Sequence, residues 1–290
     1  MSNSFLAVAR QGKNGLGRYG LTIVLCFGLT LGVMVLAMLP IIIALAILGL
    51  DPQASLEALM VNPFGFSLFN TVISVLMVFG LWLAFRNIHR RPLLTLIRAD
   101  QTIRWAQIVK GALVWSGLGL LNMGGLALLN PGRYQVTFVA QDWFQFLIPA
   151  LIAIPAIALF QGLVYAYLLQ GLGLLIRQPV WLAITIALTT GLLSQLGQPA
   201  SVIIGMIAIS TAWLMVWIVL QNQGIELLLG LCMAQSALSL LVLTSPDAPA
   251  AFPALLLRVD PIPDLAAIIT RLMTMALFYG ICLGLPWQRR

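Results

Sequence analysis

Long apolar segments separated by short polar ones constrain this chain more than any other feature. A helix needs about 20 apolar residues to cross a bilayer core, because it rises about 1.5 Å per residue. The chain has eight such segments, at 21–48, 67–85, 108–129, 144–172, 180–197, 202–220, 225–244 and 265–285. Only 8% of the residues are charged, whereas soluble domains contain roughly 25%. The sequence therefore predicts an all-α fold, a polytopic bundle of about eight transmembrane helices in a single membrane domain over 1–290.

The positions of lysine and arginine predict the orientation of this bundle. Basic residues are enriched in the cytoplasmic loops of membrane proteins. With the N-terminus in the cytoplasm, that side carries Arg10, Lys13, Arg18, Arg86, Arg90, Arg91, Arg98, Arg104, Lys110, Arg177, Arg289 and Arg290. The opposite loops keep only Arg133 and Arg258. We therefore expect both termini to be cytoplasmic. The first apolar segment is much longer than the core of a signal peptide, so we expect it to remain as a helix.

Three connections are less regular than the rest. Segment 86–107 alternates apolar and basic residues, which predicts an interfacial segment on the cytoplasmic leaflet or, alternatively, an ordinary basic loop. The five prolines between 245 and 264 predict an external loop that is ordered or re-entrant. Residues 197–199, Gly-Gln-Pro, predict a tight turn between two spans or a break within one helix.

Few residues inside the apolar segments can ionise. Glu226 lies near the cytoplasmic start of the seventh segment, and Arg271 lies about two turns into the eighth. Such residues are costly in a membrane and are candidates for function. We expect Glu226 to have a structural hydrogen-bonding role and Arg271 to extend outward towards Asp260 or Asp264. His89, the only histidine, falls in the basic loop, where we expect water to surround it.

Uncharged polar residues form the main candidate site. Gln161, Gln195 and Cys232 come from three different segments, and helical rise places them about 12 to 22 Å from the cytoplasmic edge of the bilayer core. Tyr165 and Ser236 lie one helical turn from Gln161 and Cys232. Residues of this kind usually form hydrogen bonds between helices, but a shared depth is also typical of an intramembrane site.

Composition excludes several classes of protein. One histidine and eight acidic residues leave little material for a metal centre or for acid-base catalysis, so we expect no metal and no cofactor. The basic residues border apolar segments, so we expect contact with the lipid bilayer and no nucleic-acid partner. All three cysteines, Cys26, Cys232 and Cys282, lie in apolar segments, which indicates small buried side chains rather than disulfides.

Three of the segments together resemble a known family. Residues 160–172, FQGLVYAYLLQGL, end like the family pattern RGYLLQGL, and 191–199, GLLSQLGQP, are similar to FxxxHLGNP. Residues 222–236, NQGIELLLGLCMAQS, resemble TGGLEAAIALHVVNN. These patterns belong to the CPBP family of intramembrane peptidases, which includes CAAX prenyl proteases, bacteriocin-processing enzymes and abortive-infection proteins. The resemblance covers residues 85–243 and implies a CAAX-protease-like bundle in a prokaryotic inner or internal membrane.

The chain departs from this family where the family's chemistry lies. The resemblance places the paired glutamates on Phe160 and Gln161, the arginine on Tyr165, the two histidines on Gln195 and Cys232, and the asparagine on Ser236. Only the accompanying acidic residue is kept, as Glu226. A glutamine amide forms hydrogen bonds but accepts no proton at neutral pH. A nucleophilic Cys232 would need a nearby base, which these segments do not supply.

We therefore expect a non-catalytic protein that keeps the fold. Gln161, Tyr165, Gln195, Glu226, Cys232 and Ser236 would form a binding region with no catalytic residue. The protein would serve as a binding, scaffold or assembly subunit for another membrane protein or a hydrophobic ligand. The plainer alternative is a bundle whose former site residues have changed by drift. Such a bundle binds no ligand and serves only as a subunit or assembly factor of a larger complex. An active peptidase with displaced catalytic groups is another. A carrier or channel is disfavoured by the absence of a charge series in the spans.

Overall fold

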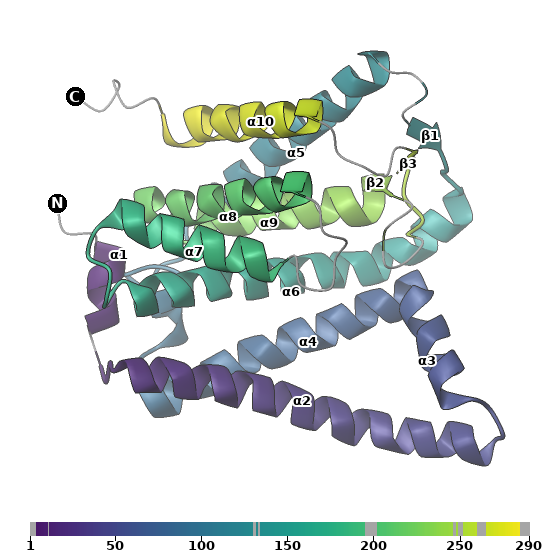
Figure 1. The fold of residues 1–290 in the computed structure, drawn as a ribbon, viewed down its shortest axis with the longest axis horizontal. Helices are drawn as coiled ribbons and strands as arrows, with labels where there is room; N and C mark the ends of the chain where they lie inside the picture. Colours follow the sequence, from purple (N-terminus) through teal and green to yellow (C-terminus); the bar gives the residue numbers. More distant parts are fainter. Residues whose placement is uncertain are drawn as a thin grey trace.

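The structure is a computed structural model that describes residues 4–10, 12–129, 132, 134–194, 202–245, 248, 252–259 and 265–284. Helices occupy each of the eight predicted apolar segments (Figure 1). Within the described residues, five helices are long and apolar enough to cross a membrane: Leu16–Ile47, Pro63–His89, Trp105–Leu128, Ala140–Leu172 and Val202–Asn222. The others are shorter: Pro179–Leu193, Glu226–Val242 and Ile268–Leu283. The predicted helical membrane bundle is confirmed, and the count of eight spans stays a prediction.

The first long helices lie at the edge of the bundle. After α1 (Ser4–Ala7), α2 (Leu16–Ile47) and α4 (Pro63–Ala84) approach closely where Gly80 meets Cys26, then diverge towards α3 (Pro52–Val61) (Figure 1). The sequence analysis did not predict α3. Its signals were local: Asp51 and Asn62 accept hydrogen bonds from backbone N–H groups at the starts of α3 and α4, and each precedes a proline in the first turn.

Helix α9 (Glu226–Ala237) forms the centre of the bundle. It packs between α5 (Trp105–Leu129) and α6 (Ala140–Leu172), and most of its residues are buried. Its contact with α5 is especially close, because a Cβ atom at Gly230 would overlap the carbonyl oxygen of Ile108. Gly111 of α5 approaches the backbone of Leu227 in the same way. Small residues at such contacts allow two membrane helices to pack backbone against backbone.

The remaining helices complete the other side of the bundle. Helices α7 (Pro179–Leu193) and α8 (Val202–Asn222) pack on each other, and α10 (Leu265–Leu283) packs on α5 and α8. The turn predicted at 197–199 and the prediction for Gln195 lie outside the described residues.

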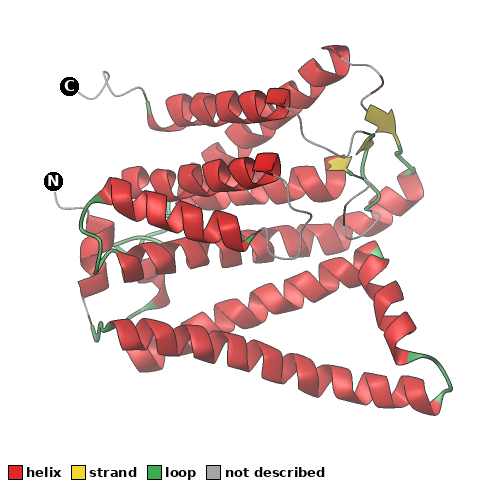
Figure 2. Ribbon diagram, in the orientation of Figure 1, coloured by secondary structure: helices red, strands yellow, loops and turns green. Residues whose placement is uncertain are grey.

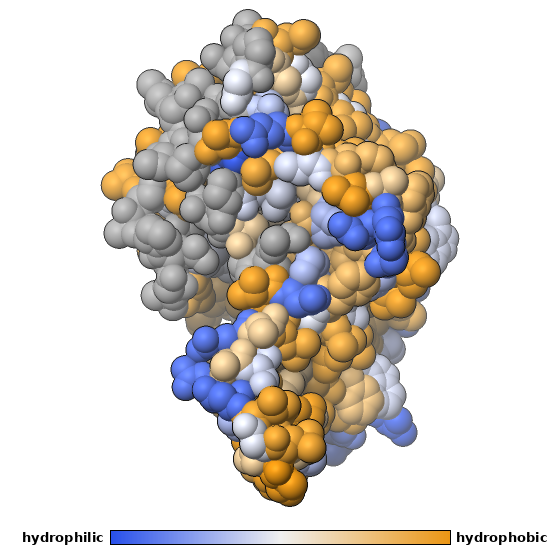
Figure 3. Space-filling view, turned by 90° about the vertical axis from the view of Figure 1, so that its right-hand side faces the viewer, coloured by the Kyte–Doolittle hydropathy of each residue, from blue (hydrophilic) through white to orange (hydrophobic). Residues whose placement is uncertain are grey.

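A small sheet departs from the all-α prediction. Strand β3 (Leu256–Arg258) pairs antiparallel with β1 (Tyr134–Val136) and parallel with β2 (Leu243–Thr244), at one end of the bundle (Figure 2). Strands of two or three residues are too short to show an alternating hydrophobic pattern, so no strand was predicted. Where this end faces the viewer, hydrophilic side chains form separate patches among hydrophobic ones (Figure 3).

The basic segments converge at the opposite end, where α2 begins and α10 ends (Figure 1). Arg18 donates to the carbonyl of Ile88 at 2.8 Å, and Lys110 donates to the carbonyl of Cys282 at 2.9 Å. The segment 86–107 folds back on the bundle here as a π-turn (Phe85–His89), a 3-10 turn (Leu93–Leu96) and an irregular stretch. Its interfacial placement stays a prediction.

Candidate functional site

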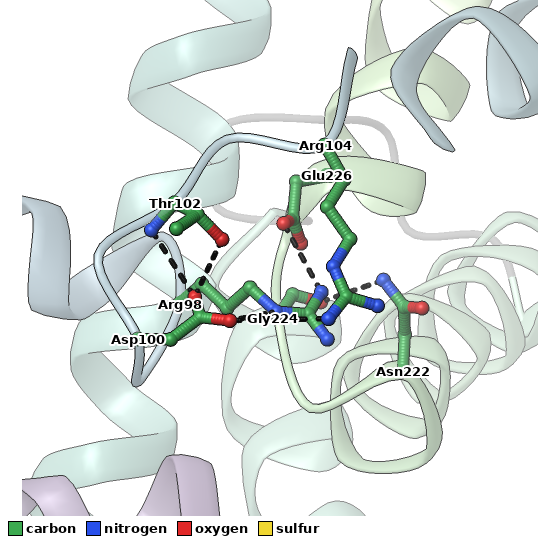
Figure 4. Close-up of polar contacts among 7 residues, drawn as sticks. All are labelled: Arg98, Asp100, Thr102, Arg104, Asn222, Gly224 and Glu226. Carbon is green, nitrogen blue, oxygen red and sulfur yellow. Dashed lines mark hydrogen bonds and ion pairs between the residues drawn. The ribbon is translucent and has the colours of Figure 1, made fainter. Parts of the chain in front are cut away.

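An ion pair joins Glu226, at the start of α9, to the loop before α5. The Glu226 side chain is fully buried, and its Oε1 atom accepts a hydrogen bond from Arg98 Nη1 at 3.1 Å (Figure 4). Gly224 leaves room for this carboxylate, since a Cβ atom there would overlap Glu226 Oε2. The backbone N–H of Ile225 donates to the carbonyl of Ile97 at 2.9 Å and holds the two segments together. The expected structural role of Glu226 thus has a physical basis in this contact.

Asp100 extends the ion pair to the surface. Its Oδ2 atom lies 3.4 Å from Arg98 Nε and 3.8 Å from Arg104 Nη2 (Figure 4). Its Oδ1 atom accepts hydrogen bonds from the Thr102 hydroxyl at 2.8 Å and the Thr102 backbone N–H at 3.1 Å. These two hydrogen bonds, helped by the two arginines, hold the pKa of Asp100 below its ordinary value.

The predicted polar site is only partly assembled. Tyr165 of α6 lies next to Thr190 of α7 and Cys232 of α9, and Ser236 is buried one turn beyond Cys232. Gln161 is exposed on the outside of the helices. Its neighbour Gly162 occupies the contact with α9, and successive helical residues point about 100° apart. The structure therefore brings Tyr165, Cys232 and Ser236 into the interior and leaves Gln161 outside it.

An apolar groove lies beside these residues. It has a volume of about 560 Å³ and runs between α2, α4, α6 and the end of α7. Phe160, the position that the resemblance assigns to a catalytic glutamate, lines it together with Cys26, Met77 and Leu168. Its only polar lining residues are Thr22, Tyr167, Thr190 and Ser194 among the described positions. The groove therefore suits an apolar chain better than a polar substrate.

The prediction of a solvated His89 is wrong. The side chain is fully buried, with its ring centre 4.8 Å from that of Tyr19 and 4.9 Å from that of Phe85. Its Nε2 atom lies 3.1 Å from the Thr22 hydroxyl. The arginines around it in the sequence indicated water, but α2 and α6 cover the ring with aromatic side chains that are distant in the chain.

Two further polar residues were missed by the sequence analysis. Gln170 of α6 is fully buried, and its amide donates to the carbonyls of Thr95 at 2.9 Å and Phe5 at 3.4 Å. Arg98 was recognised only as a basic loop residue. A buried carboxylate needs a countercharge, and this need was the signal for Arg98. Because 128 positions separate Arg98 from Glu226, local sequence patterns could not identify Arg98 as the partner.

Arg271 contacts three neighbouring helices, and its predicted extension towards the external aspartates stays a prediction. Its Nη2 atom donates to Gln235 Oε1 at 3.1 Å and to the Thr211 hydroxyl at 3.4 Å. Its guanidinium carbon lies 4.8 Å from the ring centre of Trp115. Asp260 and Asp264, the partners predicted for it, lie outside the described residues.

No three histidine, cysteine, aspartate or glutamate side chains of the described residues lie together as a set of metal ligands. Comparisons with models of protein families, with curated proteins and with solved structures found no match to this chain.

Proposed function

We propose that this chain is a catalytically inactive membrane protein with a CAAX-protease-like fold. It acts as a binding, scaffold or assembly subunit for a hydrophobic ligand or another membrane protein. The observation that carries the proposal is the position of Phe160. Where the resemblance expects a carboxylate that activates water, a phenyl ring lines an apolar groove. A site built in this way retains apolar ligands and has no group there to accept a proton.

The surroundings of Cys232 and Glu226 support the absence of catalysis. Cys232 is fully buried, and the only histidine, His89, contacts Thr22 and Tyr19 instead. Glu226 lies about 9 Å along α9 from Cys232 and is paired with Arg98. A carboxylate that is engaged by a guanidinium at this distance cannot serve as the base for Cys232.

The groove supports an apolar chain as the ligand. Its volume falls in the range of about 300–1,000 Å³ typical of ligand pockets, and helices that border a lipid bilayer provide direct access from the membrane. One wall belongs to α2, which packs mainly on α4 and exposes most of its residues. We further infer that the basic end of the bundle faces the cytoplasm of a prokaryotic inner or internal membrane. A single cysteine introduced at Ala250 should then react with an impermeant thiol reagent in intact cells, and one at Asn3 should not.

Photolabelling tests the binding proposal. We expect a diacylglycerol with a diazirine in one acyl chain to label Met77, Phe160 and Leu168 more strongly than apolar residues on the outer faces. Ile23→Trp fills the groove and should reduce this labelling several-fold. Val24→Trp is the matched control, because Val24 is exposed on the same helix and does not line the groove.

Two results would count against the proposal. Equal labelling of groove and outer residues, unchanged by Ile23→Trp, would remove the groove as a binding site. Cleavage of a prenylated peptide by the purified protein, lost on Glu226→Gln, would instead support the alternative, an active CPBP-like peptidase with atypical catalytic residues.

A further inference from the structure

A second cavity lies at the other end of the bundle from the Glu226 ion pair. It has a volume of about 320 Å³ and is bordered by α5, α9 and α10, with β1, β2 and β3 at its edge. Its polar lining includes Asn122, Gln235, Arg271, Thr274, Tyr134 and Arg258. It shares no lining residue with the apolar groove.

The described lining of this cavity has positive charges and no negative one. Arg271 and Arg258 both border it, and none of its lining residues is an aspartate or glutamate. Within the described part of the chain, Arg271 contacts neutral groups: the Gln235 amide, the Thr211 hydroxyl and the Trp115 ring. Its Nε atom is buried and has no hydrogen-bond partner among the described residues. A guanidinium in a membrane bundle is costly without an anion to offset its charge.

We propose that this cavity binds a phosphate group. Guanidinium groups hold phosphate oxygens through paired N–H donors, and Arg271 of α10 lines this cavity together with Arg258 of β3. The Asn122 amide, which donates to Thr274 Oγ1 at 3.2 Å, and the Tyr134 hydroxyl add uncharged polar groups to the same lining. Met123 and Leu126 form an apolar part of the wall.

The phosphate has two possible sources, a free anion or the headgroup of an anionic lipid. The apolar wall and the position between helices allow the second, and the small volume allows the first. This site is independent of the groove, so its failure would leave the proposed function untouched.

Binding to the purified full chain in a neutral detergent tests the site. Inorganic phosphate, phosphatidylglycerol and diacylglycerol are added separately, and retained ligand is measured by native mass spectrometry with thermal stability as a second measurement. Diacylglycerol is also expected to bind in the apolar groove, so stabilisation by phosphatidylglycerol beyond that by diacylglycerol identifies a lipid headgroup. Stabilisation by inorganic phosphate as well identifies the phosphate group itself. Diacylglycerol has the same chains without phosphate, so an equal effect of diacylglycerol and phosphatidylglycerol would overturn the proposal.

Variants connect the effect to the cavity. Arg271→Gln and Arg258→Gln should each weaken binding about tenfold or more, as expected for loss of a hydrogen bond to a charged group. Arg258→Gln serves if Arg271→Gln fails to fold. Arg104→Gln is the matched control, since Arg104 is half-exposed at the other end, and it should bind like the unmodified protein. Unchanged binding in both cavity variants would overturn the proposal. Phosphate binding that appears only when Asp260 and Asp264 are both changed to asparagine would also overturn the proposal. That result would mean that the chain's own carboxylates occupy the arginines in the unmodified protein.

Discussion

Glu226 and Arg271, two charged side chains of the described helices, have different kinds of partner. Glu226 is fully buried and paired with a guanidinium, with Glu226 Oε1 at 3.1 Å from Arg98 Nη1. The contacts of Arg271 are an amide oxygen, a hydroxyl and an aromatic ring. A countercharge cancels the net charge of a site, whereas neutral dipoles attract an ion and leave the net charge in place. The first site is therefore closed, and the second retains the capacity to bind an anion.

One pair of helices supports both sites. Helix α9 carries Glu226 at its start and Gln235 near its end, and α5 contributes Trp115 to the second site. The close contact of α9 with α5 at Gly230 lies between them. A close central contact between α9 and α5 thus separates a charge that is paired, at one end of α9, from one that contacts only neutral described groups, at the other.

The largest effect is expected from breaking the closed ion pair. Arg98→Gln leaves the Glu226 carboxylate buried without its countercharge and should destabilise the protein by about 3–5 kcal/mol. The measurement is the unfolding transition of the purified protein in detergent. Arg104→Gln is the control, because exposed pairs contribute about 0–1 kcal/mol. If Arg98→Gln lowered the stability as little as Arg104→Gln, the Glu226 carboxylate would not need Arg98 as its countercharge. The contrast between Glu226 and Arg271 would then disappear.

A smaller effect is expected at the shared helix contact. Gly230→Ala places a Cβ atom against the Ile108 carbonyl, so the helices must separate, at a cost of about 1–3 kcal/mol. Gly117→Ala on α5 is the control, because a Cβ there meets nothing within 4 Å. Alanine is also the better helix former, so this control should be neutral or slightly stabilising in the same unfolding measurement. Equal stability of the two variants would show that the contact at Gly230 is not tight.

The helices were predictable because their signals are local. A run of apolar residues predicts a helix whatever other segments pack against it. The eight apolar segments therefore coincide with helices. The asparagine and aspartate caps before Pro52 and Pro63 are equally local and would have revealed α3. The strands β1 to β3 have two or three residues each, which is too few for any periodic pattern.

The site was less predictable because its contacts depend on distant residues. The helical position of Tyr165 relative to Gly162 determines that it faces Cys232, but the sequence does not state which face of α6 meets α9. The same uncertainty led the sequence analysis to place Gln161 with Tyr165. His89 was assigned to water from its arginine neighbours, yet Tyr19 and Tyr167, about 70 residues away on either side, decide its burial. Pairing between remote segments is therefore the information that local patterns lack.

The smallest effect is expected from Asp100, at the exposed edge of the closed site. Its folded pKa lies below the ordinary value of 3.8, so its contribution to stability is present above about pH 4 and is lost as the pH falls through the lowered pKa. Asp100→Asn should therefore be slightly less stable than the unmodified protein at neutral pH. The difference between the two unfolding transitions should close below about pH 4 and shrink at high salt, because the side chain is half-exposed. The Arg98→Gln effect at neutral pH should remain at high salt, since Glu226 is buried. A loss of stability in Asp100→Asn as large as that in Arg98→Gln would mean that the exposed carboxylate, not the buried one, provides the main countercharge of Arg98.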